Sequence, residues 1–337
     1  MKREGFLFDR MISFSNLVAA AHKTFRGHRH TPAVARFSFH LETELLRLQE
    51  ELRSGSYQPR PFRVFVIREP KPRQICAAHL RDRVVHHAVC NLLEPIFERG
   101  MIADSYACRA GKGSHAAIHR VQGLTRRFPW FLQCDIRKYF ASLDHVVLKA
   151  LLRRKIKDRQ VLALLDGIID FPIPGHPPGK GIPIGNLTSQ HFANLYLDQL
   201  DHFVKETLSC KGYVRYMDDF LLFGTEKYGL FEAHQSIQDF LAERLRLELK
   251  SKAGVVASTT GGMAFLGFRI FPGLINPERR RWTRFQRRVG YLEQAFLNGG
   301  ISETDLARSV ASMIGHLQHA HTLVARRRFF ARSLRLG

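Results

Sequence analysis

Apolar residues recur at helical spacing in several stretches of this 337-residue chain. The first stretch has leucines three or four residues apart, at Leu41, Leu45, Leu48 and Leu52. Gly55 and the Pro59-Arg60-Pro61 sequence follow it, so the pattern predicts an amphipathic helix that ends before a break. Further helices are predicted over 115–128, 145–169, 189–208 and 231–249. Prolines and glycines in 171–180 predict a loop.

Two shorter apolar stretches predict strands. Residues 131–135 form an apolar run that ends in Asp135, and residues 214–223 place apolar residues on both sides of Asp218 and Asp219. Because adjacent strand residues point to opposite faces, both carboxylates reach one site only if a tight turn falls on Met217-Asp218-Asp219. The pattern therefore predicts a hairpin with two carboxylates at its tip.

Buried carboxylates indicate a bound cation. Burying two of them is costly unless a cation compensates, and Mg²⁺ is usually held by one or two carboxylates together with substrate phosphates. For Asp218 and Asp219 alone, a solvated surface turn is the alternative interpretation. Asp135 favours the metal site, because two metal ions about 3.5 to 4 Å apart need carboxylates from more than one strand.

The residues after Asp135 fit a nucleotide site. The backbone amides of Arg137, Lys138 and Tyr139 lie just beyond the strand end, where turn amides can form an anion nest for a triphosphate. Phe140 is then placed to stack under the incoming sugar. A bulky ring there leaves no room for a 2′-hydroxyl, the group that separates RNA precursors from DNA precursors.

In the order of these motifs the chain resembles the reverse transcriptases, and the resemblance covers nearly its whole length. Residues 69–75 and 81–87 look like the fingers region, 105–114 like the next block, 181–190 like the glycine loop beside the templating base, and 265–268 like the primer grip. The resemblance implies an α+β fold of the right-hand polymerase type. Its parts are an amino-terminal extension at 1–65, fingers at 66–130, a palm at 131–272 with an insertion at 145–180, and a helical thumb at 273–337.

The resemblance also assigns roles to residues, with two Mg²⁺ ions as cofactor. The implied metal ligands are Asp135, Ile136, Asp218 and Asp219, of which the three aspartates are catalytic. The implied nucleotide contacts are Lys71, Arg73, Arg137, Lys138, Tyr139, Phe140, Ile184, Gly185 and Gln190. The implied primer grip is Phe265, Leu266 and Gly267. Lys250 or Lys252 is a candidate general acid, with solvated helix-end lysines as the alternative.

The glycine loop departs from most of the family, which carries Pro-Gln-Gly followed by Ser-Pro. This chain has Pro183-Ile184-Gly185 and Ser189-Gln190, a pattern that resembles the reverse transcriptases of diversity-generating retroelements. Those enzymes copy a template RNA into cDNA with errors opposite adenines. Ile184 removes a side-chain amide, and a pocket that checks shape by apolar contact alone discriminates weakly. The resemblance also implies a small basic helical accessory protein that assembles as a ring.

Charge and cysteine content agree with a cytoplasmic nucleic-acid enzyme. Lys and Arg exceed Asp and Glu by 52 to 30, a net charge of +22 that favours polyanion binding. Residues 279–337 hold twelve arginines, no lysine and three acids, as expected for thumb helices on a duplex. The five cysteines form no Cys-x-x-Cys pair and are expected to be buried reduced thiols. No secretory or membrane-length segment is present, so no membrane partner is expected.

Three interpretations remain open. The first is an error-prone retroelement reverse transcriptase that binds template RNA, a cDNA primer and deoxynucleotides. The second is a related polymerase used in antiphage defence. The third is a non-catalytic RNA-binding or maturase-like protein on the same fold, against which the intact Asp135, Asp218 and Asp219 argue. For His316, His319 and His321, packing or RNA contact is expected in preference to metal binding.

Overall fold

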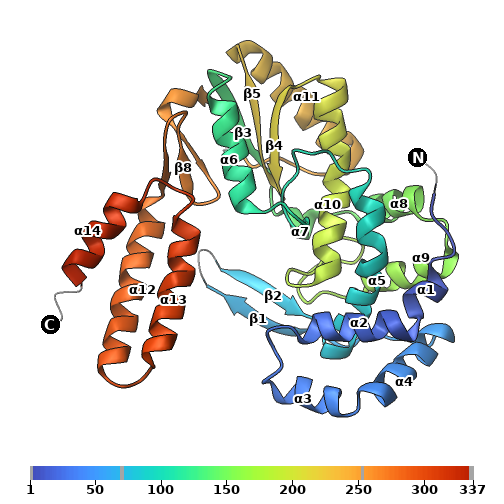
Figure 1. Cartoon of the computed structure of the whole chain (residues 1–337). Coiled ribbons are helices and arrows are strands. Elements are labelled where there is room, and N and C mark those ends of the chain that lie inside the picture. Colours follow the sequence, from blue (N-terminus) through green and yellow to red (C-terminus); the bar gives the residue numbers. More distant parts are fainter. Residues whose placement is uncertain (1–2, 69–71, 252–253, 334–337) are drawn as a thin grey trace.

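The computed structural model describes residues 3–68, 72–251 and 254–333. Within these ranges the chain is an α+β fold with three small antiparallel sheets (Figure 1), so the α+β part of the predicted fold class is confirmed. The helices before the central sheet are α1 (Phe8–Ile12), α2 (Phe14–Phe25), α3 (Pro32–Phe39), α4 (Leu41–Arg53), α5 (Leu80–Glu98) and α6 (Ser114–Thr125). The later helices are α7 (Tyr139–Ser142), α8 (His145–Lys155), α9 (Arg159–Asp170), α10 (Leu187–His202), α11 (Lys227–Leu245), α12 (Arg279–Leu297), α13 (Glu303–Leu317) and α14 (Leu323–Ser333).

The strands form a hairpin, a four-stranded sheet and a three-stranded sheet. Their bounds are β1 (Arg63–Ile67), β2 (Arg73–Ala77), β3 (Trp130–Asp135), β4 (Gly212–Tyr216), β5 (Asp219–Gly224), β6 (Val255–Ser258), β7 (Met263–Phe265), β8 (Phe268–Ile270) and β9 (Ile275–Pro277). The four-stranded sheet has the order β4-β5-β3-β6, and every pair in it is antiparallel. The predicted 131–135 strand and the 214–223 hairpin are both present: β3 and β5 pair in the centre of the sheet, and β4 is an edge strand.

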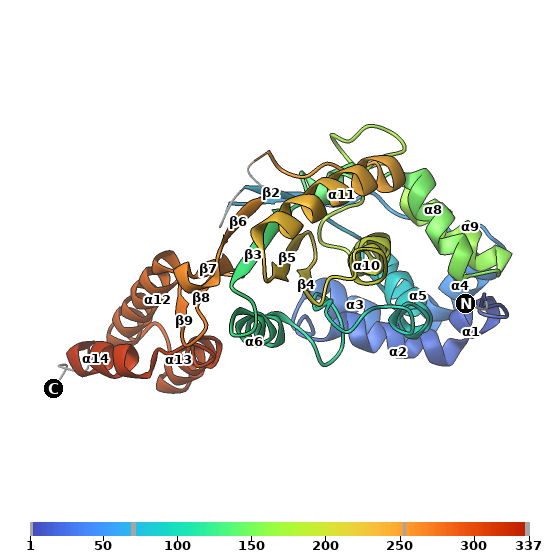
Figure 2. The same ribbon diagram turned by 90° about the horizontal axis from the view of Figure 1, so that it is seen from above.

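Alternating side chains of the central sheet pack in two directions. Figure 2 shows α6 and α11 on opposite sides of the strands. Phe131 and Leu221 share a core with the apolar residues of α6 on one face. Leu132 and Leu222 share the larger core with α10 and α11 on the other face. The period of two in the sequence therefore produces a sheet covered by helices on both faces over much of its length, and polar side chains are left for the strand ends.

The amino-terminal extension forms a helical layer beside α5. Leu45, Leu48 and Leu52 of α4 are buried in the main core, which confirms the predicted amphipathic helix. At the other end of the chain, α12, α13 and α14 enclose a separate small core with Phe285, Val289 and Leu317 at its centre. Figure 1 shows these helices standing apart from the body formed by α5, α8, α9 and α10.

Two predicted helices differ from the observed ones. The 145–169 helix is broken into α8 and α9 at Ile156-Lys157-Asp158, because the Asp158 carboxylate accepts from the Val161 amide and caps a new helix. The 231–249 helix ends at Leu245, since Arg246 adopts the left-handed conformation with φ 52°. Leu249 thus lies beyond α11, in an isolated bridge to Ile136.

Helix α6 meets the region around α13 through histidine side chains. His115 Nε2 lies 2.9 Å from His316 Nδ1, and the rings of His115 and His319 stack with centroids 3.7 Å apart. His321 accepts from the Ile275 amide at 3.0 Å. These histidines therefore pack, as expected. Burial, the neighbouring histidines and Arg281 lower the pKa of His115 to about 4, so the His115 ring is neutral near pH 7.

All five cysteines are free thiols, and Cys76, Cys90 and Cys134 are buried as expected. Cys108 is instead exposed. In the part of the chain that the structure describes, no helix combines the length and the apolar character needed to cross a bilayer.

Candidate active site

A two-residue turn joins β4 to β5. Tyr216 pairs with Asp219 across the hairpin, so Met217 and Asp218 form the turn, and Met217 has φ 58°. The predicted tight turn is confirmed. Arg215 supports the turn: it is fully buried and donates to the Met217 carbonyl at 3.2 Å.

Arg215 is itself held by a buried ion pair. Its guanidinium donates to both carboxylate oxygens of Asp201 at 2.6 Å, and a further bond of 3.2 Å reaches Asn194 Oδ1. Tyr213 also donates to Asp201, at 2.8 Å. The hairpin tip is thus fixed through its interior by a satisfied polar network.

The end of β3 brings the third carboxylate to the same place. Asp135 is the cross-strand partner of Asp219, and directly opposed residues of an antiparallel pair point to the same face. The Ile136 amide donates to the Asp218 carbonyl at 3.2 Å. Asp135, Asp218 and Asp219 therefore lie together at one end of the sheet, on segments far apart in the sequence. The Ile136 side chain is buried and has no ligating atom, so a metal contact from this residue falls to its backbone carbonyl.

Asp218 and Asp219 lie in an environment that disfavours their negative charge. Burial raises the pKa of Asp219 to about 7, and the neighbouring charges of Asp135 and Asp218 add to this effect. Gln133 opposes it, because its Nε2 donates to Asp219 Oδ1 at 3.3 Å. Burial and Asp135 also raise the pKa of Asp218, whereas the positive charges of Lys250 and Arg73 lower it.

These residues fit a divalent cation. Asp135 Oδ1 is buried without a hydrogen-bond partner, and hard carboxylate oxygens are the ligands that Mg²⁺ prefers. The other oxygen, Oδ2, lies 2.5 Å from the Lys250 ammonium, which supplies a positive charge at the same place. Within residues 3–68, 72–251 and 254–333, no group of three His, Cys, Asp or Glu side chains is arranged to hold a metal ion by itself. Further oxygen ligands, as from substrate phosphates, are therefore needed to fill the coordination sphere.

The loop after Asp135 makes more hydrogen bonds to the rest of the protein than the sequence predicts. The Arg137 amide donates to the Glu248 carbonyl at 2.8 Å, and its side chain donates to the Glu248 carboxylate at 2.9 Å. Lys138 takes the left-handed conformation and starts α7. Among the described residues, its amide and that of Tyr139 have no acceptor, so an anion nest at this loop contains two amides in place of three.

Tyr139 and Phe140 differ in their exposure. The Tyr139 ring is buried, and its hydroxyl donates to the Ala193 carbonyl at 2.5 Å, so a nucleotide contact from this residue falls to its amide alone. Phe140 is half-buried, with its ring centroid 5.6 Å from that of Tyr139. The Phe140 carbonyl accepts from the Ile182 amide at 2.8 Å and so joins the candidate sugar-binding ring to the glycine loop.

The glycine loop is also hydrogen-bonded to β2 and to Ala78, which follows it. The Cys76 amide of β2 donates to the Ile184 carbonyl at 3.0 Å, and the Ala78 amide donates to Asn186 Oδ1 at 3.1 Å. Gly185 has φ 113°, and a Cβ there would lie 2.8 Å from the Ile75 side chain, so glycine is required for this close approach. Gln190, one turn into α10, is half-buried.

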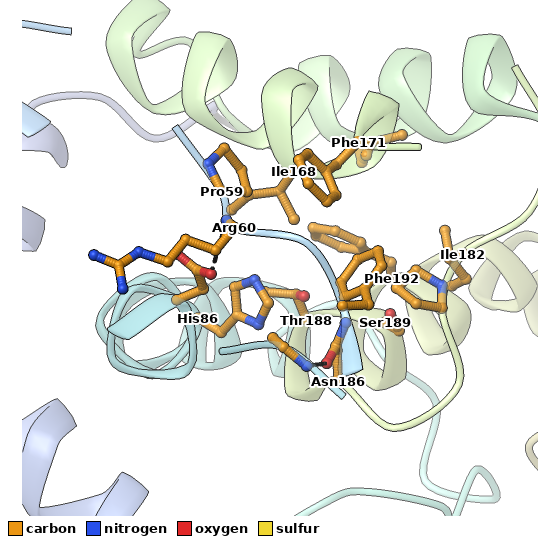
Figure 3. A pocket seen from close by; sticks show the side chains of 15 residues that line it. Pro59, Arg60, His86, Ile168, Phe171, Ile182, Asn186, Thr188, Ser189 and Phe192 are labelled. Carbon is orange, nitrogen blue, oxygen red and sulfur yellow. Dashed lines mark hydrogen bonds between the residues drawn. The ribbon is translucent and has the colours of Figure 1, made fainter. Parts of the chain in front are cut away.

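A narrow, mostly apolar pocket lies behind this loop (Figure 3). His86 and Asn186 line it, and His86 Nδ1 and Asn186 Nδ2 are buried without hydrogen-bond partners in the described structure. Its volume of about 10 Å³ is the space that one water molecule needs.

Other predicted site residues are placed as follows. Arg73 begins β2 and is exposed, whereas Lys71 and Lys252 lie outside the described residues. Leu266 and Gly267 form the turn between β7 and β8, with φ 50° and 77°. Arg281 of α12 donates to the Leu266 carbonyl at 3.1 Å, so α12 contacts this turn directly.

Phe265 at the start of that turn is a core residue, 1% exposed. Its contribution to a primer grip is therefore to shape the backbone. Sequence reasoning missed Gln133, which orients Asp219, and the Arg215–Asp201 pair beneath the turn. A glutamine two residues before Asp135 on the same strand face was the available signal for the first.

The chain was compared with known proteins. Residues 68–270 match the family described as reverse transcriptase (RNA-dependent DNA polymerase). The chain belongs to the reverse transcriptase family. Protein YkfC of Escherichia coli K12 is 29% identical over 291 residues, covering 72% of this chain and 76% of YkfC. Group II intron-encoded protein LtrA of Lactococcus lactis is 24% identical over 335 residues, covering 77% of this chain and 54% of LtrA.

Among solved structures, this reverse transcriptase is similar to telomerase from Candida albicans, determined with a fragment of telomeric RNA. The TM-score is 0.50 at 13% identity, covering 83% of this chain and 57% of the telomerase chain. The similarity is one of fold. The chain thus spans about three quarters of YkfC but little more than half of LtrA and of the telomerase.

Proposed function

We propose that this reverse transcriptase is an active RNA-directed DNA polymerase whose catalytic carboxylates are Asp135, Asp218 and Asp219. The observation that carries the proposal is the β3–β5 register, which sets Asp135 opposite Asp219 at the hairpin tip. A bound pair of Mg²⁺ ions would lower the pKa of the primer 3′-hydroxyl and stabilise the leaving pyrophosphate. Asp135, Asp218, Asp219 and the Ile136 carbonyl would hold them.

The chain's own residues position the substrates. Arg73 and the Lys138 and Tyr139 amides would bind the triphosphate, and Phe140 would exclude a 2′-hydroxyl. Lys250, beside Asp135, would donate a proton to the leaving pyrophosphate. A right-hand division into fingers (66–130), palm (131–272) and thumb (273–337) agrees with the separate thumb core and its contact with the Leu266–Gly267 turn.

The thumb supports binding of a hybrid duplex. A groove of about 1460 Å³ runs along α12. It is lined by Arg279, Arg280, Arg281, Arg284, Arg287, Arg288 and Tyr291, among others. Closely spaced guanidinium groups with few acids are the chemistry that binds phosphates without reading sequence.

The test is templated synthesis by the full chain. Primed RNA, deoxynucleotides and Mg²⁺ should yield cDNA with the wild-type chain and none with Asp218→Ala/Asp219→Ala, while RNA affinity stays within about twofold, since the carboxylates do not hold the RNA backbone. Asp239→Ala, an exposed acid on α11, is the matched control and should synthesise normally. Synthesis by the double variant would refute the site. RNA binding without any synthesis by the wild-type chain would support the maturase-like alternative.

We further propose that synthesis is error-prone at template adenines, as in diversity-generating retroelements. The supporting feature is the glycine loop, where an apolar Ile184 precedes Gly185 and Ser189 precedes Gln190. Sequencing the cDNA should show errors concentrated at adenines, and Ile184→Gln should reduce them. Faithful cDNA would favour the defence-type alternative. A small basic helical accessory protein remains a proposal drawn from the resemblance, and pull-down with a neighbouring gene product would test it.

A further inference from the structure

The first described residues form a fixed segment on the body of the protein. In this N-terminal strap, Arg3–Phe8, the Glu4 amide donates to the Lys155 carbonyl at 2.9 Å, and the Lys157 amide donates to the Glu4 carbonyl at 2.8 Å. The amides of Leu7 and Phe8 donate to Asp158 Oδ2 at 2.8 and 3.0 Å. Four hydrogen bonds thus hold the strap against the connection between α8 and α9.

Phe6 lies between these anchor points with its ring in solvent. It is 89% exposed and has φ 56°, a left-handed conformation that is unfavourable for a bulky side chain. An exposed ring in an unfavourable backbone conformation adds nothing to folding, yet the bonds on both sides impose it. A local conformation that is held in this way points to a function for the ring.

The surroundings of Phe6 are basic. The Lys157 ammonium lies 5.8 Å from the ring centroid, within cation–π range. Lys157 also crosses Gly5 so closely that a Cβ at Gly5 would lie 2.5 Å from its Cε. At the other end of the strap, Arg3 lines a cleft of about 710 Å³ together with Arg153 and Arg154.

Most acids near this basic surface already have partners, whereas the exposed Asp9, next to the strap, has none among the described residues. Glu4 pairs with Arg99 at 2.7 Å, Asp166 with Arg153 at 2.5 Å, and Glu206 with His202 at 2.6 Å. Asp158 accepts from the backbone amides of the strap. In the described part of the chain, Arg3 has no acidic partner. Positive charge is therefore available to a ligand next to the exposed ring.

An aromatic face beside Lys and Arg side chains is the chemistry that binds single-stranded nucleic acid, because an unpaired base can stack on the ring while phosphates meet the cations. We propose that Phe6 stacks on an unpaired base of an RNA single strand, with phosphates on Arg3, Arg154 and Lys157. The N-terminus lies on the side away from the thumb in both Figure 1 and Figure 2, so this site is distinct from the thumb groove. The proposal rests on the proposed function in one respect, namely that the RNA is the template.

The test measures binding to full-length protein whose thumb groove is filled with an unlabelled RNA–DNA hybrid. A labelled, unstructured 20-nucleotide RNA is titrated by fluorescence anisotropy. Phe6→Ala should weaken its binding about fivefold or more, the effect of losing one stacked base, and Phe6→Trp should restore it. Phe39→Ala, which removes a ring that is 84% exposed elsewhere on the extension, is the matched control and should bind like the wild type.

The outcomes separate this inference from the proposed function. Unchanged RNA affinity in Phe6→Ala overturns the inference. The exposed ring would then be attributed to contact with a protein partner. An equal loss in Phe39→Ala, or no recovery in Phe6→Trp, also overturns it. Extension of a short primed template without a single-stranded overhang should be unaffected by Phe6→Ala. Absence of extension by the wild-type chain would instead count against the polymerase assignment alone.

Discussion

Lys250 is bonded to Asp135 twice. Its amide donates to the Asp135 carbonyl at 2.9 Å, and its ammonium lies 2.5 Å from Asp135 Oδ2. The first bond fixes the segment after α11 to the end of β3, and the second directs the side chain at the candidate metal ligand. Both bonds hold the Lys250 ammonium beside the candidate metal ligand. There its positive charge and its proton could both serve phosphoryl transfer.

Lys250→Met should lower the single-turnover rate of primer extension about a hundredfold, because a general acid typically contributes 10²- to 10⁴-fold. Lys250→Arg keeps the charge but cannot give up a proton near pH 7, so it should remain slow. The exposed Lys211→Met is the control. A fast Lys250→Arg variant would show that charge alone is needed, and a fast Lys250→Met variant would remove the residue from the mechanism.

Asp219→Asn should stabilise the metal-free protein at high pH. Because the pKa of Asp219 rises from 3.8 to about 7 on folding, its ionised form is disfavoured in the native state. The cost is absent below pH 3.8, grows as the pH rises, and is complete above about 7. At pH 8 with EDTA we expect Asp219→Asn to be about 4 kcal/mol more stable in urea unfolding, since the rise in pKa corresponds to that difference in free energy, with the difference becoming small near pH 4.

The control for this measurement is Asp239→Asn, an exposed acid that should leave stability unchanged at both pH values. Equal stability of Asp219→Asn and the wild type at pH 8 would show that burial does not disfavour the Asp219 carboxylate. Added Mg²⁺ should narrow the difference, because a bound cation compensates the charge in the wild type.

Arg215→Met should destabilise the protein by about 3 to 5 kcal/mol, since it leaves the buried Asp201 without its counter-charge. The double variant Arg215→Met/Asp201→Leu removes both charges and should recover part of this loss. Urea unfolding measures both. A single variant that is no less stable than the double variant would show that the pair is not coupled.

Phe140→Ala should let the enzyme accept ribonucleotides. Phe140 is half-buried, and its backbone carbonyl accepts a hydrogen bond from the Ile182 amide of the glycine loop. We propose that its ring contacts the sugar there. We expect the ratio of kcat/KM for dNTP over rNTP to fall about 10- to 100-fold, the range that apolar contacts supply. Phe140→Tyr is the matched control and should keep the ratio. An unchanged ratio in Phe140→Ala would place the sugar elsewhere.

The sequence was sufficient for the features that depend on local patterns. The hairpin turn at Met217-Asp218 followed from apolar flanks around two acids, and the Leu45–Leu52 helix from its spacing. The ends of helices were harder to predict from the sequence. Leu247 and Leu249 continue the helical spacing of α11, but the left-handed Arg246 ends the helix, and nothing in the local pattern marks an arginine for that conformation.

Tertiary pairing was beyond the local pattern. Asp201 and Arg215 are fourteen residues apart, and only packing of α10 against the hairpin brings them together. Tyr139 stands in the predicted nucleotide loop, yet a tyrosine between a loop and a core can point either way, and here the Ala193 carbonyl accepts its hydroxyl. The Lys250–Asp135 bond likewise depends on a strand bridge between segments far apart in the chain.

The most direct test of the account is single-nucleotide extension by Asp135→Asn, which keeps the size of the side chain and removes its charge. With primed RNA, Mg²⁺ and the complementary deoxynucleotide, the wild-type chain should extend the primer, and Asp135→Asn should do so at least about a thousandfold more slowly while binding the RNA normally. Extension by Asp135→Asn at close to the wild-type rate would contradict the assignment of the active site to the end of β3 and the β4–β5 hairpin.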